Sequence, residues 1–168
     1  EAALFGKVDV VCSGKDNGYR SISKDFAVPN DARYFHITTN NTIYGSQWQT
    51  IPFTSNMMVA DMSSDIFSRS LPFNSFGLIY AGAQKNLGPA GVSLVIVNQQ
   101  MLGKIKRNIP VIMDYRNHIR EGSMLNTPPV FAVYTCMLTL RWLKAMGGIS
   151  VMEQRNEEKA RLLYKEID

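Results

Sequence analysis

Lys85 and Asp61 are the residues of this sequence whose types and positions best fit chemistry on a carbonyl compound. Lys85 follows a short apolar run and lies among small residues (Ala81-Gly82-Ala83), which would leave room for a flat ring. Ligands of α/β sheets bind beyond the carboxyl ends of the strands, so Lys85 would face such a crevice. Partial desolvation frees a lysine amine to attack an aldehyde and form an imine. The alternative is a solvated lysine in a hairpin turn.

Asp61 ends the preceding apolar run, residues 57–61, and is therefore expected at the same edge of the sheet. A carboxylate in that position is costly to bury without a cationic partner. A protonated pyridine nitrogen is such a partner, and keeping it charged makes pyridoxal phosphate an electron sink. The structural alternative is that Asp61 caps the turn through Ser63 and Ser64.

A third polar segment, residues 38–45, follows another apolar run and contains Thr42. Its amides and hydroxyls can hydrogen-bond the phenolic oxygen or the phosphate of a bound ring. Asn, Thr and Gly also form ordinary turns, so this segment alone is compatible with both interpretations.

Five short apolar runs separated by turn-rich segments are predicted to be the strands that position these groups. They are residues 8–12, 34–38, 57–61, 78–81 and 92–97. Their near-continuous hydrophobicity is typical of strands buried on both faces. The sequence therefore predicts the α/β class, with a mostly parallel central sheet and flanking helices.

Helices are predicted toward the carboxyl end. Thr127 and Pro128 form an N-cap and N1 pair, apolar residues recur at helical spacing after them, and Gly147-Gly148 provides a stop. Ser150 with Glu153 resembles a capping box that opens the final helix. Residues 1–7 are expected to be the tail of a helix, and both ends look cut, which indicates a fragment of something longer.

Composition narrows the class of protein. The 168 residues are 45% hydrophobic and 19% charged, and lack the roughly 20-residue apolar run of a membrane span, so a cytoplasmic globular domain is expected. The net charge of +4 is spread along the chain. Its densest basic group, at residues 104–107, favours a solvated face over a nucleic-acid site.

The cysteines and histidines form no cluster at metal-ligand spacing. Cys12 and Cys136 are far apart and are predicted to be reduced core residues. His36 and His118 are likewise isolated, so no metal site is expected.

The three strand ends together resemble the phosphoserine aminotransferases, a branch of the class V aminotransferases. The matching segments are Asn41-Thr42-Ile43-Tyr44-Gly45, Ala60-Asp61-Met62-Ser63-Ser64, Tyr80-Ala81-Gly82-Ala83-Gln84-Lys85-Asn86 and Asn126-Thr127-Pro128-Pro129. The resemblance implies that residues 1–168 form the central and carboxyl part of a large domain of the aspartate-aminotransferase type (fold type I). An amino-terminal segment and a small domain would lie outside it.

The same resemblance implies roles for individual residues. Lys85 becomes the Schiff-base lysine and proton carrier of pyridoxal 5'-phosphate, and Asp61 the partner of its ring nitrogen. Thr42 would bond near the phenolic oxygen, and Gln84 would help to hold the phosphate. Asn126 and Thr127 would reach the cofactor phosphate of a neighbouring subunit in a homodimer, where Thr127 could also cap its helix.

The implied reaction exchanges an amino group between glutamate and 3-phosphohydroxypyruvate, giving O-phosphoserine and 2-oxoglutarate. In bacteria such enzymes also serve pyridoxine synthesis. The chain lacks the family's stacking tryptophan and substrate arginines, so alone it is expected to be inactive. Ser70 replaces the usual proline after Arg69. The alternatives are another class V enzyme, such as a desulfurase, or a non-catalytic structural fragment.

Overall fold

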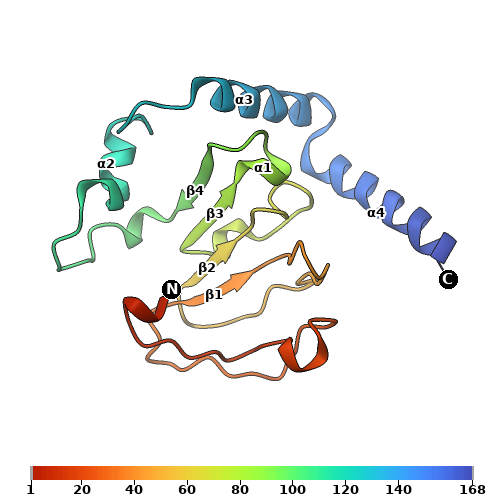
Figure 1. Cartoon of the computed structure of the whole chain (residues 1–168), viewed down its shortest axis with the longest axis horizontal. Helices are drawn as coiled ribbons and strands as arrows, with labels where there is room; N and C mark the ends of the chain where they lie inside the picture. Colours follow the sequence, from red (N-terminus) through yellow and green to blue (C-terminus); the bar gives the residue numbers. More distant parts are fainter. Residues whose placement is uncertain (1, 168) are drawn as a thin grey trace.

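The computed structural model describes residues 2–167 and places a four-stranded sheet at the centre of the chain (Figure 1). The strands are β1 (Phe35–Thr38), β2 (Met58–Asp61), β3 (Leu78–Gly82) and β4 (Ser93–Val97). They lie in that order; β1, β2 and β3 are parallel, and β4 is antiparallel to β3. The predicted α/β class with a mostly parallel sheet is confirmed.

Four of the five predicted strands are present, and their ends shift by one residue at most. The prediction was wrong for residues 8–12, which are irregular, with Val8 and Val10 exposed. Within the described residues β1 is an edge of the sheet, so no strand lies beside it on the outer side. Apolar, β-branched residues do not hold a strand without a partner ladder.

Strand register decides which side chains share a face of the sheet. Ile37, Ala60 and Ile79 are aligned on neighbouring strands and are buried. One position further along, Asp61 is aligned with Tyr80. Because successive side chains of a strand point to opposite faces, Asp61 and Tyr80 lie on the face opposite the core.

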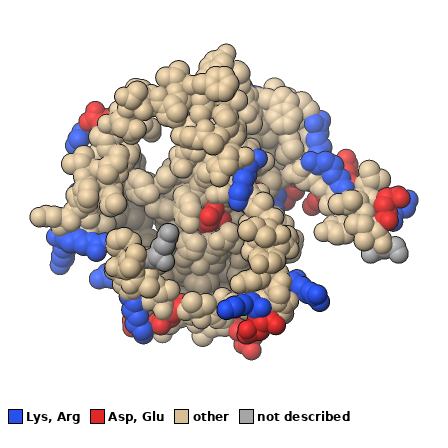
Figure 2. Space-filling model, viewed as in Figure 1, with Lys and Arg blue, Asp and Glu red and all other residues tan. Residues whose placement is uncertain are grey.

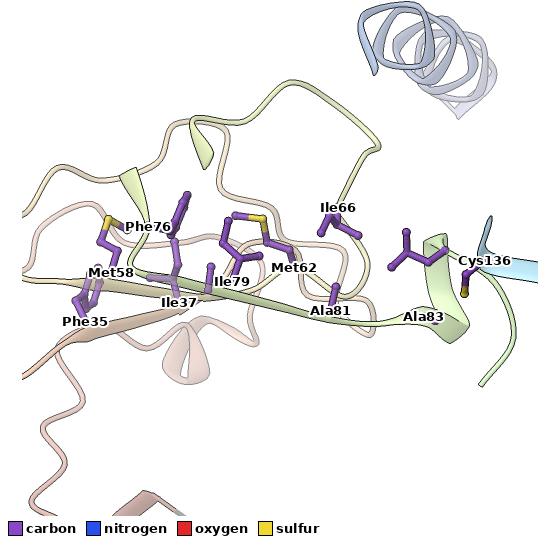
Figure 3. Close-up of a cluster of buried hydrophobic side chains, with 12 residues drawn as sticks. Phe35, Ile37, Met58, Met62, Ile66, Phe76, Ile79, Ala81, Ala83 and Cys136 are labelled. Carbon is purple, nitrogen blue, oxygen red and sulfur yellow. The ribbon is translucent and has the colours of Figure 1, made fainter. Parts of the chain in front are cut away.

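The hydrophobic core covers one face of the sheet, where Figure 3 shows its buried side chains. Its members are Phe35, Ile37, Met58, Ala60, Met62, Ile66, Phe76, Ile79, Ala81, Ala83, Leu87 and Cys136. Met62 and Ile66 have no exposed surface. Burial of these two side chains therefore stabilises the position of the segment that follows Asp61.

The helices are α1 (Ala83–Asn86), α2 (Tyr115–Arg120), α3 (Val130–Ala145) and α4 (Gly148–Ile167). Short 3-10 turns occur at Ala2–Leu4, Lys15–Asn17, Phe73–Ser75, Gln99–Met101 and Val111–Met113. The helix tail expected over residues 1–7 is only the first of these turns, and Glu1 lies outside the described residues. Figure 1 shows α3 running along the end of the sheet that carries α1, and α4 extending away from it.

The predicted start of α3 was wrong, because Thr127 does not cap it. The helix begins at Val130, with Pro129 in the N-cap position. A residue before proline is biased away from the α region, and both Thr127 and Pro128 precede one. The first helical hydrogen bond runs from the Val133 N–H to the Pro129 carbonyl, at 3.1 Å. The predicted stop is confirmed, since α3 ends at Ala145, just before Gly147-Gly148.

The predicted capping box was also wrong. Helix α4 already begins at Gly148, so Ser150 lies inside its first turn. The Glu153 carboxylate accepts a hydrogen bond from the backbone N–H of Ser70, at 3.2 Å, instead of closing the box. The Glu153 carboxylate, which would accept the local capping bond, is bonded to Ser70 in another segment instead.

Ser70 can make this bond because it has a backbone N–H. Proline at this position could not donate the bond to Glu153, because it has no N–H. A second bond runs from the Asn156 amide to the Ser68 carbonyl, at 2.8 Å. These two contacts fasten α4 to the segment that follows Asp61.

Both cysteines are free thiols. Cys136 is buried in the core, as predicted. The prediction was wrong for Cys12, which is half-buried outside the core, its thiol donating to the Ser23 carbonyl at 3.4 Å. Residues 2–167 contain no group of three potential metal-ligating side chains.

Charged side chains are scattered over the face shown in Figure 2, with no continuous basic stripe there. Lys104, Lys106 and Arg107 are all exposed. None of the described helices has the length and apolar character that crossing a membrane requires.

Candidate functional site

The segments that follow β1, β2 and β3 are joined by hydrogen bonds at the carboxyl edge of the sheet. The Asn40 amide donates to the Ser64 hydroxyl, which donates in turn to the Asn40 carbonyl, both at 2.9 Å. The Ser63 hydroxyl accepts from the Gly82 N–H at 3.0 Å. The three polar segments predicted to share an edge therefore do so, and hold one another in place.

Lys85 and Thr42 meet directly at this edge. The Lys85 Nζ donates to the Thr42 Oγ1 at 2.7 Å, although 43 residues separate them in sequence. Both side chains are exposed. The desolvation expected for Lys85 is therefore not provided by the described residues.

Lys85 is carried by the one-turn helix α1 rather than by a simple turn. Ala83 and Leu87, at the two ends of this helix, are buried and joined by a backbone hydrogen bond of 3.0 Å. The Asn86 amide donates to the Ile66 carbonyl. The exposed amine thus projects from a turn that is fixed at both ends, Ala83 and Leu87, in the core.

Gly88 allows α3 to pack closely behind this turn. A Cβ built on Gly88 would lie 2.9 Å from the Cys136 sulfur and 3.4 Å from the Cys136 nitrogen. Figure 3 shows Cys136 beside Ala83. The contact through a residue without a side chain fixes the position of α1 against α3.

Asp61 ends β2 and is half-buried. Its Oδ1 accepts a hydrogen bond from the Ser63 N–H at 2.9 Å, so the turn-capping role left open from sequence is present. Among the described residues, no hydrogen bond is made to the second carboxylate oxygen. A ring-nitrogen partner therefore remains compatible with the cap.

The loop that carries Thr42 is ordered by its own polar groups. The Asn41 Oδ1 accepts from the N–H groups of Ile43 and Tyr44, at 3.1 and 3.2 Å. Gly45 has a φ of 72°, which glycine adopts without a steric cost. This Asx-type turn fixes the backbone on both sides of Thr42.

Gln84 and the pair Asn126 and Thr127 are placed less tightly. Gln84 is exposed, and its Oε1 approaches within 2.7 Å of the position that a Cβ on Gly82 would occupy. Asn126 and Thr127 are exposed between α2 and α3. Within residues 2–167, no hydrogen bond connects either of them to Lys85, so their cofactor-binding roles stay predictions.

Sequence reasoning missed a buried ion pair that anchors the Thr42 loop. Asp65 has no exposed surface, and its Oδ2 lies 2.8 Å from the Arg69 Nη2. The same Nη2 donates to the Trp48 carbonyl at 2.7 Å, and the Gln47 amide donates to the Asp65 Oδ1 at 3.0 Å. The i,i+4 spacing of Asp and Arg was the only signal in sequence, and it also describes ordinary surface pairs.

We expect Asp65→Asn to destabilise the fold by roughly 3 kcal/mol, because removal of one partner leaves a buried charge uncompensated. Burial alone would raise the pKa of Asp65, but Arg69, with Thr39 and Ser68, holds that pKa below its ordinary value. This stability is present above the unfolded-state pKa and is lost as pH falls through the lower folded pKa. Urea denaturation at pH 7 and at acid pH measures both effects.

The matched control is Asp31→Asn, which removes a carboxylate from an exposed site. Its free energy of unfolding should change by less than about 0.5 kcal/mol. If the two variants were equally stable at neutral pH, the anchoring role of the ion pair would be excluded.

Comparisons with known proteins identify the family of the chain. Residues 4–168 match the family model described as aminotransferase class-V. The phosphoserine aminotransferase of Flavobacterium psychrophilum is 55% identical over the whole chain, which spans 47% of that relative. The chain therefore spans about half the length of the curated relatives it matches.

Solved structures give the same result for the backbone. A phosphoserine aminotransferase structure, from work on radiation damage of its Schiff base, superposes with a TM-score of 0.93 at 45% identity, over 98% of this chain and 47% of that one. The pyridoxal-phosphate-bound phosphoserine aminotransferase of Trichomonas vaginalis gives a TM-score of 0.83 at 37% identity, over 89% and 45%. The resemblance noted from sequence is thus confirmed, and the chain belongs to the class V aminotransferases.

Proposed function

We propose that this chain supplies the lysine-bearing core of a pyridoxal-phosphate-dependent phosphoserine aminotransferase. The reaction would move an amino group between L-glutamate and 3-phosphohydroxypyruvate, giving O-phospho-L-serine and 2-oxoglutarate. The observation that carries the proposal is the bond between Lys85 and Thr42 at the edge where the Asp61 strand also ends. The names of the similar proteins support the substrate class.

The functional groups at this edge are of the types that pyridoxal phosphate requires. Lys85 offers an exposed amine for an aldehyde, Thr42 a hydroxyl for the phenolic oxygen, and Asp61 a carboxylate for the ring nitrogen. Gln84 offers an amide for the phosphate end. When bound, the cofactor supplies an electron sink for charge that develops at the substrate α-carbon.

The chain's own residues would hold and move protons around that centre. The Lys85 amine can accept a proton from a substrate carbon and return it, which is general acid–base catalysis by a positioned side chain. Thr42 orients the amine through a neutral hydroxyl. Asp61, held by the Ser63 N–H, keeps a negative charge at a fixed place on the sheet edge.

We also propose how this chain fits into the large domain and into a homodimer. Residues 1–168 would form the central and carboxyl part of a fold type I large domain, since they span about half of each similar protein. Asn126 and Thr127 would reach the neighbouring cofactor phosphate in a homodimer. Val130 and Phe131, which follow them after two prolines, are exposed in this chain and would gain from burial against a second copy or against the rest of a longer protein.

We also propose that the protein is cytoplasmic and that it contributes to pyridoxine synthesis. The similar proteins are named phosphoserine aminotransferases, which favours that activity over a desulfurase. A desulfurase uses a mobile catalytic cysteine, and neither cysteine of this chain has that character. Cys136 is buried, and the Cys12 thiol is hydrogen-bonded to a backbone carbonyl.

We expect the intact protein, incubated with pyridoxal phosphate, to absorb visible light and to retain the cofactor after borohydride reduction. Peptide mass spectrometry should place the reduced adduct on Lys85, because this amine shares the site with Thr42. The matched control is exposed Lys24, which should stay unlabelled. An adduct distributed over surface lysines, or no visible absorbance, would exclude the proposed cofactor chemistry.

A further inference from the structure

A hydrogen-bonded pair of aromatic side chains lies on the sheet face that carries Asp61. The His36 Nε2 and the Tyr80 hydroxyl are 2.9 Å apart. Their rings are stacked, with centroids 5.9 Å apart and an angle of 27° between the planes. The pair connects β1 to β3 across the intervening strand β2.

Strand register brings this pair next to Asp61. His36 is aligned with Val59 on β2, two residues before Asp61 and on the same face. Tyr80 is aligned directly with Asp61 on the neighbouring strand. Relative to Asp61, His36 therefore lies toward the amino end of β2, and Tyr80 lies beside the carboxylate on β3.

The charge of Asp61 acts on both members of the pair. Partial desolvation lowers the pKa of His36, and Asp61 opposes this by raising it. Desolvation raises the pKa of Tyr80, and Asp61 and Tyr34 raise it further. Near neutral pH the tyrosine is thus uncharged, and desolvation disfavours a charged imidazole that would neutralise Asp61.

We propose that the His36–Tyr80 pair is a positioning element for Asp61, which orients the carboxylate toward the edge and leaves its charge for a cationic ring nitrogen. This inference rests on the proposed function, since it assigns Asp61 that partner. In this role the two hydrogen-bonded rings, on the same sheet face as Asp61, would keep water away from the carboxylate. Water there would compete for the carboxylate oxygens and weaken their attraction for a cation.

Tyr80→Phe in the intact protein tests the pair, because it removes one hydroxyl and keeps the ring. We expect the dissociation constant for pyridoxal phosphate to rise about 3- to 10-fold, the range for one net hydrogen bond. In an Asp61→Asn background the same change should have little effect, because the group being positioned has lost its charge. Tyr34→Phe, which removes a nearby hydroxyl not bonded to His36, is the matched control.

A second measurement does not require the cofactor. The ring resonances of His36, followed by NMR as pH is varied, should titrate at lower pH in Asp61→Asn, because the carboxylate that raises the pKa is gone. An unchanged titration, or a Tyr80→Phe effect of equal size in both backgrounds, would overturn the positioning role and leave the proposed function intact. Failure of the unsubstituted protein to bind the cofactor would overturn both.

Discussion

Lys85→Ala is expected to abolish covalent retention of pyridoxal phosphate and, with it, transamination by the intact protein. No other described amine lies at this edge in contact with Thr42. The amine would be both the attachment point and the proton carrier, so its removal leaves nothing to replace either role. The expected loss is total in the borohydride assay.

The fold should survive this substitution. Lys85 is exposed, whereas its neighbours Ala83 and Leu87 hold α1 in the core. Alanine is also a good helix former, so the free energy of unfolding should change by less than about 0.5 kcal/mol. Lys24→Ala is the matched control for loss of an exposed positive charge. Undiminished cofactor retention by Lys85→Ala, with native far-UV circular dichroism, would exclude Lys85 as the attachment residue.

The strands of this chain were predictable because their apolar runs are bounded by polar turns. β2 and β3 end at the predicted Asp61 and within one residue of the predicted Ala81. Their parallel pairing then brings the strand ends to one edge, which is a property of topology rather than of any single residue. The meeting of Lys85 and Thr42 followed from this.

The failed predictions share a physical cause, which is that a local signal was overridden by tertiary contacts or by the backbone. Residues 8–12 have strand propensity but no partner ladder. Thr127 has a capping side chain, but two prolines delay α3. Glu153 could close a capping box with Ser150, but it binds Ser70 instead. For residues 8–12 and Glu153 the deciding partner could not be known from sequence, whereas for Thr127 the prolines that follow it were visible.

The supports of the site were invisible in sequence for a related reason. Asp65 and Arg69 look like a surface i,i+4 pair, yet the carboxylate is fully buried and reaches Gln47. His36 was interpreted as an isolated histidine, and its bond to Tyr80 spans 44 residues. Unlike the Lys85–Thr42 contact, these two contacts do not lie at predicted strand ends and leave no periodic pattern in the sequence.

Asp61→Asn should leave the fold and cofactor attachment intact but slow proton abstraction by roughly 100- to 1000-fold, the cost of removing one preorganised electrostatic group. Asparagine keeps an oxygen that can accept the Ser63 N–H, so the turn after β2 should persist. What is lost is the negative charge. A neutral amide cannot hold a proton on a ring nitrogen as a carboxylate does.

Single-turnover kinetics of the intact protein with glutamate isolates this effect, because only the half-reaction is observed. The reduced adduct should still form on Lys85 in Asp61→Asn, which separates loss of the charge from loss of the site. Asp31→Asn, an exposed carboxylate on another segment, should react at the unsubstituted rate. If Asp61→Asn also kept that rate, the carboxylate would be only a cap for the turn through Ser63, and the charge needed at the ring would have to come from a different residue.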